Sequence, residues 1–377
     1  MFFAIVLSIW AVIHLYVSAR LAGIPWVAAH LSPRALALSF LALFLCYPVA
    51  RLLTTRGWRG LATGFELVGS TWMGVLFLLF AALLAADVLT LGGLLLPRAA
   101  PALRGWAAVV AAVLAVVALV QGLRAPVVVE QEVTLARLPR AAEGLSVAVV
   151  SDLHLGSLIG RRWLAARIAQ LHALKPDAVL IAGDLVDSDI DNALPLTPVL
   201  RTLQAPRGVW LALGNHDAYA GAARVAEFAE SAGVRALRNR SVELAPGVRL
   251  AGIDDPAVLR HPRSGREDRR VERALADAPP ADVTLLLAHS PEQGDIAAAA
   301  RGGADVMFCG HTHGGQIWPF SYLVRRRYSY FIGRYETEGL TLFVGRGTGT
   351  WGPRMRLWRR GEILLVRLRA GGAATPS

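Results

Sequence analysis

Five short stretches of the sequence carry side chains that bind metal ions, and each stretch follows a run of apolar, strand-like residues. The stretches are Ser151–His154, Gly183–Asp184, Gly214–Asp217, His289–Glu292 and Gly310–Gly315. They supply four His, two Asp and one Asn as candidate ligands. Imidazole nitrogens combined with carboxylate and amide oxygens suit Mn, Fe, Zn or similar ions better than metals that prefer thiolates. The sequence therefore predicts a metal site.

Each stretch taken alone has a simpler explanation. An isolated Asp-x-His, a Gly-Asp pair or a single His is more often a turn or a hydrogen-bonded polar residue than a ligand. Five of them in order, each at the end of a strand, are hard to explain as structure, because burying so many unpaired polar groups together is costly. The series as a whole therefore favours a functional metal site over a purely structural role.

The apolar runs that lie before these stretches predict the strands of an α/β sheet. Strand-like runs occur at Val127–Leu135, Leu145–Val150, Ala178–Ala182, Val209–Leu213, Val248–Ile253, Val283–Ala288, Val306–Cys309, Leu340–Val344 and Gly361–Arg369. Helix-compatible segments separate the early runs: Arg162–Leu174, a proline-interrupted Leu194–Leu203, and Ala220–Ala232. Side chains at the carboxyl ends of such strands converge on one crevice, where open α/β sheets place their sites.

The order D-x-H, G-D, G-N-H-D, H and G-H-x-H closely resembles the calcineurin-like metallophosphoesterase superfamily, over roughly Leu145 to Leu368. The segments Gly252–Pro256, Gly314–Ile317 and Gly345–Arg356 are similar to its membrane-associated bacterial branch, and the whole chain is similar to transmembrane proteins with a metallophosphoesterase domain. The resemblance implies a β-sandwich flanked by helices. One departure, Gly361-Glu362 where Pro-Glu is expected, lies outside the metal motifs.

The resemblance also implies roles for the motif residues around two divalent cations of unknown identity. The first ion would be held by Asp152, His154, Asp184 and His313, and the second by Asp184, Asn215, His289 and His311. Two such cations would clamp the phosphoryl oxygens and activate a water. His216 would contact the scissile phosphate or protonate the leaving group rather than bind metal, and Asp217 would orient and charge His216.

The N-terminal third of the chain predicts a membrane region. Hydrophobic residues make up 54% of the sequence, and the excess lies in the first 124 residues. Four stretches there are almost free of charge: Phe2–Ala19, Ala35–Ala50, Leu67–Ala86 and Gly105–Leu123. A membrane-spanning helix needs about 20 apolar residues. We expect a four-helix transmembrane domain at 1–124, a metallophosphoesterase domain at 125–369, a tail at 370–377 and a multi-pass integral membrane protein.

The net charge of +11 does not indicate a nucleic-acid partner. Residues 1–124 carry eight Arg against Glu66 and Asp87, and these Arg lie between the apolar stretches. The remaining residues hold 31 basic and 26 acidic side chains, too mild an excess for a nucleic-acid groove. With four spans, four Arg flank each side of the bilayer, so the positive-inside rule favours neither orientation. Arg137 and Arg140 slightly favour a cytoplasmic catalytic domain.

A few residues outside the motifs leave alternatives open. The Arg325–Arg327 cluster is either a solvated loop or a basic lip for anionic headgroups or a substrate phosphate. Asp87 is either a functional carboxylate within the membrane or a solvated one near a span end. The remaining histidines, His14, His30, His172 and His261, are interpreted as structural or solvent-exposed, and no disulfide is expected between Cys46 and Cys309.

The sequence thus predicts a membrane-anchored hydrolase of phosphate ester or anhydride bonds. Membrane anchoring favours a lipid-linked substrate, and the resemblance makes hydrolysis of the pyrophosphate in UDP-2,3-diacylglucosamine, a lipid A precursor step, the sharpest candidate. The alternatives are a phosphoprotein or small-molecule phosphatase, a nuclease of the same superfamily, and a metal-binding scaffold without catalysis. The intact ligand set argues against the scaffold, and no basic groove supports the nuclease.

Overall fold

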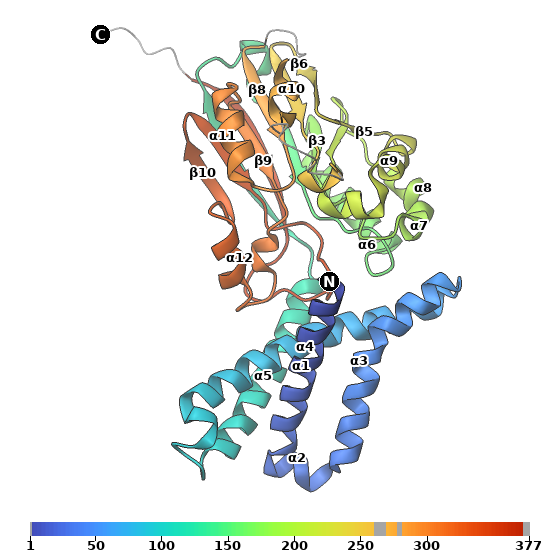
Figure 1. Cartoon of the computed structure of the whole chain (residues 1–377). Coiled ribbons are helices and arrows are strands. Elements are labelled where there is room, and N and C mark those ends of the chain that lie inside the picture. Colours follow the sequence, from blue (N-terminus) through green and yellow to red (C-terminus); the bar gives the residue numbers. More distant parts are fainter. Residues whose placement is uncertain (1, 260–268, 277–280, 372–377) are drawn as a thin grey trace. The chain divides into compact units, whose positions relative to one another are not determined.

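The computed structural model describes residues 2–259, 269–276 and 281–371. Most of the predicted tail at 370–377 lies outside the described residues, and so does His261. The chain forms two compact units: residues 1–124 with 352–358, and residues 125–351 with 359–377 (Figure 1). We describe each unit separately.

The first unit is built from apolar helices: α1 (Phe2–Ala22), α2 (Pro25–His30), α3 (Pro33–Thr55), α4 (Arg59–Thr90) and α5 (Ala100–Leu123). Within the described residues, α3, α4 and α5 are long and apolar enough to cross a membrane. The fourth expected stretch lies in α1, and the part of α1 whose side chains the structure describes, Leu7–Ala22, is a shorter apolar helix. The fourth span therefore stays a prediction.

A polar cluster joins three helices of this unit and gives Asp87 its partners. The Asp87 side chain on α4 is buried and lies 2.6 Å from Arg20 Nε of α1 and 2.7 Å from Arg104 Nε of α5. The Tyr16 hydroxyl donates to the same carboxylate at 2.7 Å. Of the two alternatives for Asp87, simple solvation does not describe this geometry, because the carboxylate is enclosed by interhelical ion pairs.

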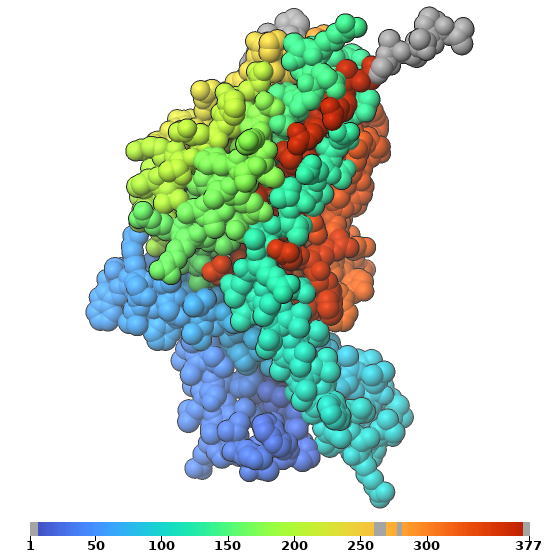
Figure 2. Space-filling view, turned by 180° about the vertical axis from the view of Figure 1, so that it is seen from behind, coloured from blue at the N-terminus to red at the C-terminus, as the bar shows by residue number. Residues whose placement is uncertain are grey.

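The second unit is a sandwich of two six-stranded sheets. One sheet has the order β1-β12-β2-β3-β4-β5 and the other β10-β11-β9-β8-β7-β6. The first contains β1 (Val127–Leu135), β2 (Ser146–Val150), β3 (Ala178–Ala182), β4 (Val209–Ala212), β5 (Val234–Ala236) and β12 (Glu362–Ala370). The second contains β6 (Arg240–Ala245), β7 (Val248–Gly252), β8 (Val283–Leu287), β9 (Val306–Cys309), β10 (Gly333–Thr337) and β11 (Leu340–Val344). Figure 2 shows β12, in red, beside β1, with which it pairs in parallel.

Apolar side chains from both sheets form the core between them. Val147, Leu180 and Trp210 of the first sheet pack with Leu285 and Phe308 of the second, all nearly inaccessible to water. The strands β2 to β5 are mutually parallel, and so are β7, β8, β9 and β11. The carboxyl ends of the parallel strands within each sheet therefore lie at one edge. The expected β-sandwich is confirmed.

Helices cover the two outer faces of the sandwich. The first sheet is covered by α6 (Arg161–Leu174), α7 (Ile190–Ala193), α8 (Thr197–Leu200) and α9 (Asn215–Ser231). The second is covered by α10 (Arg270–Ala276) and α11 (Gln293–Arg301), while α12 (Ser321–Arg327) follows β9. The proline-interrupted segment expected at Leu194–Leu203 forms a 3₁₀ turn at Leu194–Leu196 followed by α8. Pro195 and Pro198 account for this break, because proline lacks the amide hydrogen that a continuous helix needs.

Candidate metal centre

The turns that follow five strands bring the seven predicted ligands together. Asp152 and His154 follow β2, Asp184 follows β3, Asn215 follows β4, His289 follows β8, and His311 and His313 follow β9. Five of them have left-handed backbone conformations, with φ between 46° and 71°: Asp152, His154, Asp184, His311 and His313. Such φ values are uncommon outside glycine and recur at functional sites, where the surrounding structure holds the turn in place.

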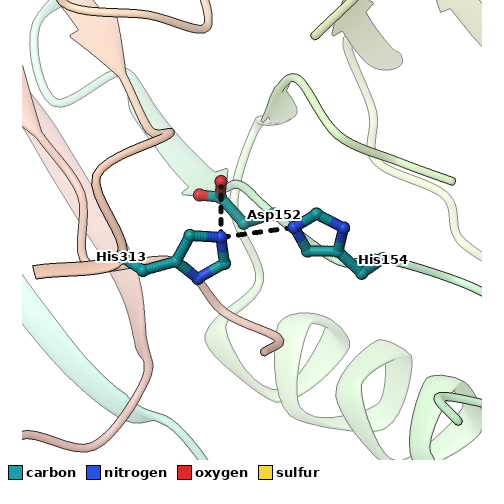
Figure 3. Close-up of side chains that lie close together, drawn as sticks. All are labelled: Asp152, His154 and His313. Carbon is teal, nitrogen blue, oxygen red and sulfur yellow. Dashed lines mark hydrogen bonds and ion pairs between the residues drawn. The ribbon is translucent and has the colours of Figure 1, made fainter. Parts of the chain in front are cut away.

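The first group of ligand atoms comes from Asp152, His154 and His313 (Figure 3). The Nε2 atoms of His154 and His313 lie 3.2 Å apart, and His313 Nε2 lies 3.3 Å from Asp152 Oδ1. One ligand atom from each of the three residues lies within 4.8 Å of the other two. These distances are compatible with one cation bound by all three side chains.

A second group contains Asp184, His289 and His311. His289 Nε2 lies 3.1 Å from Asp184 Oδ2, 3.1 Å from His311 Nδ1 and 3.0 Å from Asn215 Oδ1. The same Asp184 oxygen lies 3.7 Å from His154 Nε2 of the first group. Asp184 therefore lies between the two groups, as a bridging ligand must.

The charges and lone pairs of this site fit divalent cations. Burial works to lower the pKa of His154 and of His289, yet the surrounding carboxylates raise both pKa values above the ordinary range. Although burial works to raise it, the same histidines hold the pKa of Asp184 far below its usual value. Imidazole nitrogens that face one another near 3 Å require a proton or a cation between them. This donor set of imidazole, carboxylate and amide groups suits borderline divalent metals.

Groups behind the ligands fix their orientation. His289 Nδ1 donates to the carbonyl of Ala182 at 2.9 Å, which leaves the lone pair of Nε2 facing the other ligands. His311 Nε2 lies 2.7 Å from the Tyr328 hydroxyl, while its Nδ1 faces His289. The Tyr328 contact did not follow from any sequence motif.

Two glycines allow the turns to approach closely. A β-carbon on Gly214 would lie 2.2 Å from Asp184 Oδ1, and one on Gly183 would lie 2.4 Å from His289 Nδ1. Any side chain at either position would collide with a predicted ligand.

His216 lies beside the ligands, and its neighbouring carboxylate is not the expected one. Its backbone N–H donates to Asp184 Oδ1 at 2.8 Å, and its Nδ1 lies 3.3 Å from Asp187 Oδ1. Asp187 Oδ1 is also 3.5 Å from His154 Nδ1. Although burial opposes it, hydrogen bonds with these two histidines hold the pKa of Asp187 well below its usual range.

Asp217, which we expected to orient His216, makes a different set of contacts. Its buried carboxylate accepts backbone N–H bonds from Gly214 at 2.8 Å, Val186 at 2.9 Å and Leu185 at 3.3 Å. Burial and the nearby negative charge of Asp184 raise the pKa of Asp217 to about 6. Asp217 thus joins the turns after β3 and β4, and Asp187 takes the place beside His216. The second acid of Gly183-Asp-Leu-Val-Asp187 was the missed sequence signal.

Aromatic and basic side chains surround this centre. The ring centroids of Tyr219 and Trp351 lie 5.4 and 5.6 Å from that of His216. The exposed Arg325–Arg327 cluster forms the end of α12. Arg327 pairs with Glu292 at 2.9 Å, and the Arg325 guanidinium lies 4.8 Å from the centroid of the Phe331 ring. The residue that follows the cluster, Tyr328, contacts the predicted ligand His311.

Comparison with known proteins gives three informative similarities and one family match. Residues 145–315 match the family model described as calcineurin-like phosphoesterase. Proteins named transmembrane protein with metallophosphoesterase domain, from Danio rerio and Bos taurus, are 34% and 32% identical over 273 and 277 residues. Each of these alignments covers 70% of this chain but only 62% of the relative's length. An uncharacterized metallophosphoesterase of Aquifex aeolicus is 30% identical over 246 residues, which cover 63% of this chain and 89% of that protein.

Proposed function

Because the chain belongs to the calcineurin-like metallophosphoesterase family, we propose that it is a membrane-anchored hydrolase that cleaves phosphate ester or pyrophosphate bonds with two divalent cations. The observation that carries this proposal is the convergence of Asp and His side chains from the ends of β2, β3, β8 and β9, in groups whose ligand atoms lie within 4.8 Å of one another. Family membership supports hydrolysis of phosphoric esters. The number of cations, the substrate and the membrane topology belong to the proposal.

The ligand assignment follows the family motif and two of the three groups of close donors, whereas the third group, His154, Asp184 and His216, is assigned no cation because His216 is given another role. We assign Asp152, His154, Asp184 and His313 to the first cation, and Asp184, Asn215, His289 and His311 to the second. When bound, the two cations supply Lewis acidity for the phosphoryl oxygens and lower the pKa of an attacking water. The carboxylate of Asp184 serves both positions, which its distances of 3.1 Å from His289 and 3.7 Å from His154 support.

His216 is assigned the role of proton donor to the leaving oxygen. Asp187, 3.3 Å from Nδ1, favours a proton on that nitrogen and stabilises the imidazolium form. Nε2 is then the atom from which a proton passes to the oxygen that leaves phosphorus. Asp187 is a positioning residue in this scheme, and Asp217 holds the turns on which Asp184 and His216 lie.

The proposed substrate is an amphiphile presented at a bilayer surface. A catalytic unit on the same chain as α3, α4 and α5 meets lipid-linked substrates at a raised local concentration without any additional contact. UDP-2,3-diacylglucosamine is the sharpest candidate, and it requires a cytoplasmic active site, which Arg137 and Arg140 favour. A phosphoprotein or a small soluble phosphoester is the alternative.

The test is a substrate panel on the purified full-length chain, in detergent and in vesicles. The panel contains an aryl phosphate, a phosphodiester, the nucleotide-linked lipid and its deacylated headgroup. We expect hydrolysis that requires divalent metal, stops with chelator and favours the acylated substrate. Asp184→Ala, which removes the shared ligand, is the matched inactive control.

Three outcomes would contradict parts of the proposal. Full activity after exhaustive metal removal would exclude the metal mechanism. Equal efficiency on acylated and deacylated substrates would return the assignment to a soluble phosphoester or phosphoprotein. Bound metal without hydrolysis of any compound in the panel would favour the scaffold alternative.

A further inference from the structure

The segment that follows the last metal motif exposes apolar and cationic side chains together. Trp318, Phe320, Tyr322 and Leu323 are 39%, 44%, 62% and 60% exposed, and the exposed Arg325–Arg327 cluster follows them on α12 (Figure 1). We propose that these seven residues, the α12 surface, form a membrane-interface contact of the catalytic unit. The apolar side chains would enter the interfacial layer of the bilayer, and the arginines would bind anionic headgroups.

One end of the α12 surface contacts a predicted ligand, and the other end packs on the turn that follows His313. Before it, Gly315 packs so closely on Ser321 that a β-carbon on the glycine would lie 2.3 Å from Ser321 Cα. After it, the Tyr328 hydroxyl lies 2.7 Å from His311 Nε2. Gln316 also exchanges two hydrogen bonds with the backbone of Trp351, at 2.9 and 3.0 Å. Contacts at this surface therefore act on a segment that is fixed to the predicted ligands.

The residue types of this surface match a bilayer interface. Tryptophan and tyrosine concentrate at headgroup level, because their rings are apolar while their N–H and O–H groups remain hydrated. Arginine binds phosphate through its planar fork, and basic side chains are attracted to the negative surface of an anionic leaflet. Arg327 is paired with Glu292, whereas Arg326 is exposed and forms no ion pair among the residues that the structure describes. The surface therefore keeps a positive charge.

A bilayer is the occupant that the chain itself favours over a protein partner. Exposed clusters of apolar side chains mark either protein or membrane contacts. Among the described residues, this chain carries three helices long and apolar enough to cross a membrane, which favours a bilayer near the catalytic unit. The adjoining arginines complement the charge of anionic lipids. This inference does not depend on which phosphate bond the enzyme cleaves.

The test uses the full-length chain in lipid nanodiscs with a fluorophore on Leu323→Cys. The native Cys46 and Cys309 are buried, so the label reports the introduced position. The matched control is a label on Glu243→Cys, which is exposed on β6, the edge strand at the opposite side of the sheet from β10. Lipids that carry a quencher on the upper acyl chain report contact with the bilayer. Metal content equal to that of the unmodified protein checks that each variant is folded.

We expect quenching at position 323 to be several-fold stronger than at position 243 in discs that contain anionic lipid. Arg326→Gln should reduce this quenching, whereas Arg326→Lys should largely preserve it. Equal quenching at both positions would overturn the proposal, and so would quenching that is no stronger in anionic than in zwitterionic discs. No substrate is present, so a failure of the proposed hydrolysis and a failure of this surface are distinguishable.

Discussion

At the residue scale, His216 and Asp184 are neighbours with separable roles. His216→Ala should lower turnover on an aryl phosphate by roughly 10²- to 10⁴-fold, as for loss of an acid catalyst, with metal content near normal. Asp184→Ala should instead lose metal, because Asp184 lies between both ligand groups. Steady-state kinetics combined with elemental analysis of the purified variants checks both expectations. A metal-free His216→Ala protein would show that the role assigned to His216 is wrong.

Asp187 and Asp217 should also have different roles: Asp187 positions His216, whereas Asp217 stabilises the fold. Asp187→Asn should lower turnover by about 10- to 100-fold, by analogy with other residues that orient a functional histidine, with little change in thermal stability. Asp217→Ala should leave buried N–H groups of Gly214, Val186 and Leu185 without an acceptor. Each buried N–H group that loses its acceptor should lower the free energy of unfolding by about 1–3 kcal/mol.

Thermal unfolding in detergent, measured beside turnover on the same preparations, distinguishes these two effects. If Asp217→Ala were as stable as the unmodified chain and lost only turnover, Asp217 rather than Asp187 would act on His216. If both variants lost only stability, neither carboxylate would belong to the proton-transfer machinery.

Tyr328 tests how an outer residue controls a ligand. Its hydroxyl lies 2.7 Å from His311 Nε2, on the side away from His289. Tyr328→Phe removes this contact, so the imidazole is held less firmly, and we expect about 10-fold weaker binding of one cation. Calorimetric titration of the metal-depleted protein with Mn²⁺ should show one weakened site and one unchanged site. Unchanged binding at both would show that Tyr328 does not orient His311.

The sequence identified the motif residues of this site better than it identified their partners. Seven predicted ligands converge because each follows a strand, and strand ends in a sheet meet at one edge. Their individual roles stay predictions. Asp187 and Tyr328 were missed for different reasons: Asp187 shares a turn with Asp184 and was overlooked, whereas Tyr328 reaches His311 only through the fold of α12. Sequence spacing alone cannot predict the contact between Tyr328 and His311.

At the scale of elements, the turns after β3 and β4 must pass closer together than a side chain permits. A β-carbon on Gly214 would lie 2.2 Å from Asp184 Oδ1 and 2.5 Å from the Asp184 backbone nitrogen. Gly214→Ala should therefore displace Asp184 and reduce metal content. Gly294→Ala in α11 is the matched control, because nothing lies within 4 Å of its β-carbon position. Elemental analysis of both variants checks the prediction, and equal metal content would contradict it.

Strand prediction succeeded for the buried central strands and for the edge strand β1, but it missed the other three edge strands. Central strands such as β3 and β8 are entirely buried and appear in the sequence as continuous apolar runs. The edge strands β6 and β10 are partly exposed and contain Arg and Glu, so no continuous apolar run marked them. The third unpredicted strand, β5, has only three residues. Pairing with a neighbour, rather than local composition, makes these segments strands.

At the scale of the whole molecule, the chain order is less simple than the two predicted consecutive domains. Residues 352–358 group with the helices of residues 1–124, although they lie between β11 and β12 in the sequence. The Arg356 N–H donates to the carbonyl of Ala118 at 2.8 Å, and a β-carbon on Gly122 would lie 2.4 Å from the Arg354 carbonyl oxygen. Hydrophobicity along the chain cannot reveal that a segment from the second half of the sequence packs with the N-terminal helices. The predicted domain boundaries therefore stay predictions.

The last prediction concerns how the helical unit is held in a membrane. Large apolar side chains on α3 and α5, including Leu38, Trp106 and Val116, are exposed on the protein surface. Leaving apolar surface in water costs roughly 25 cal/mol per Å², so a medium other than water must cover these faces. We expect the full-length chain to stay in the membrane fraction after alkaline carbonate and high salt, and to be released only by detergent. A peripheral protein released by carbonate from the same membranes is the control. Release of the chain by carbonate alone would mean that these helices lie on the bilayer or pack against another protein, because a chain held by spans of this length cannot leave while the bilayer is intact.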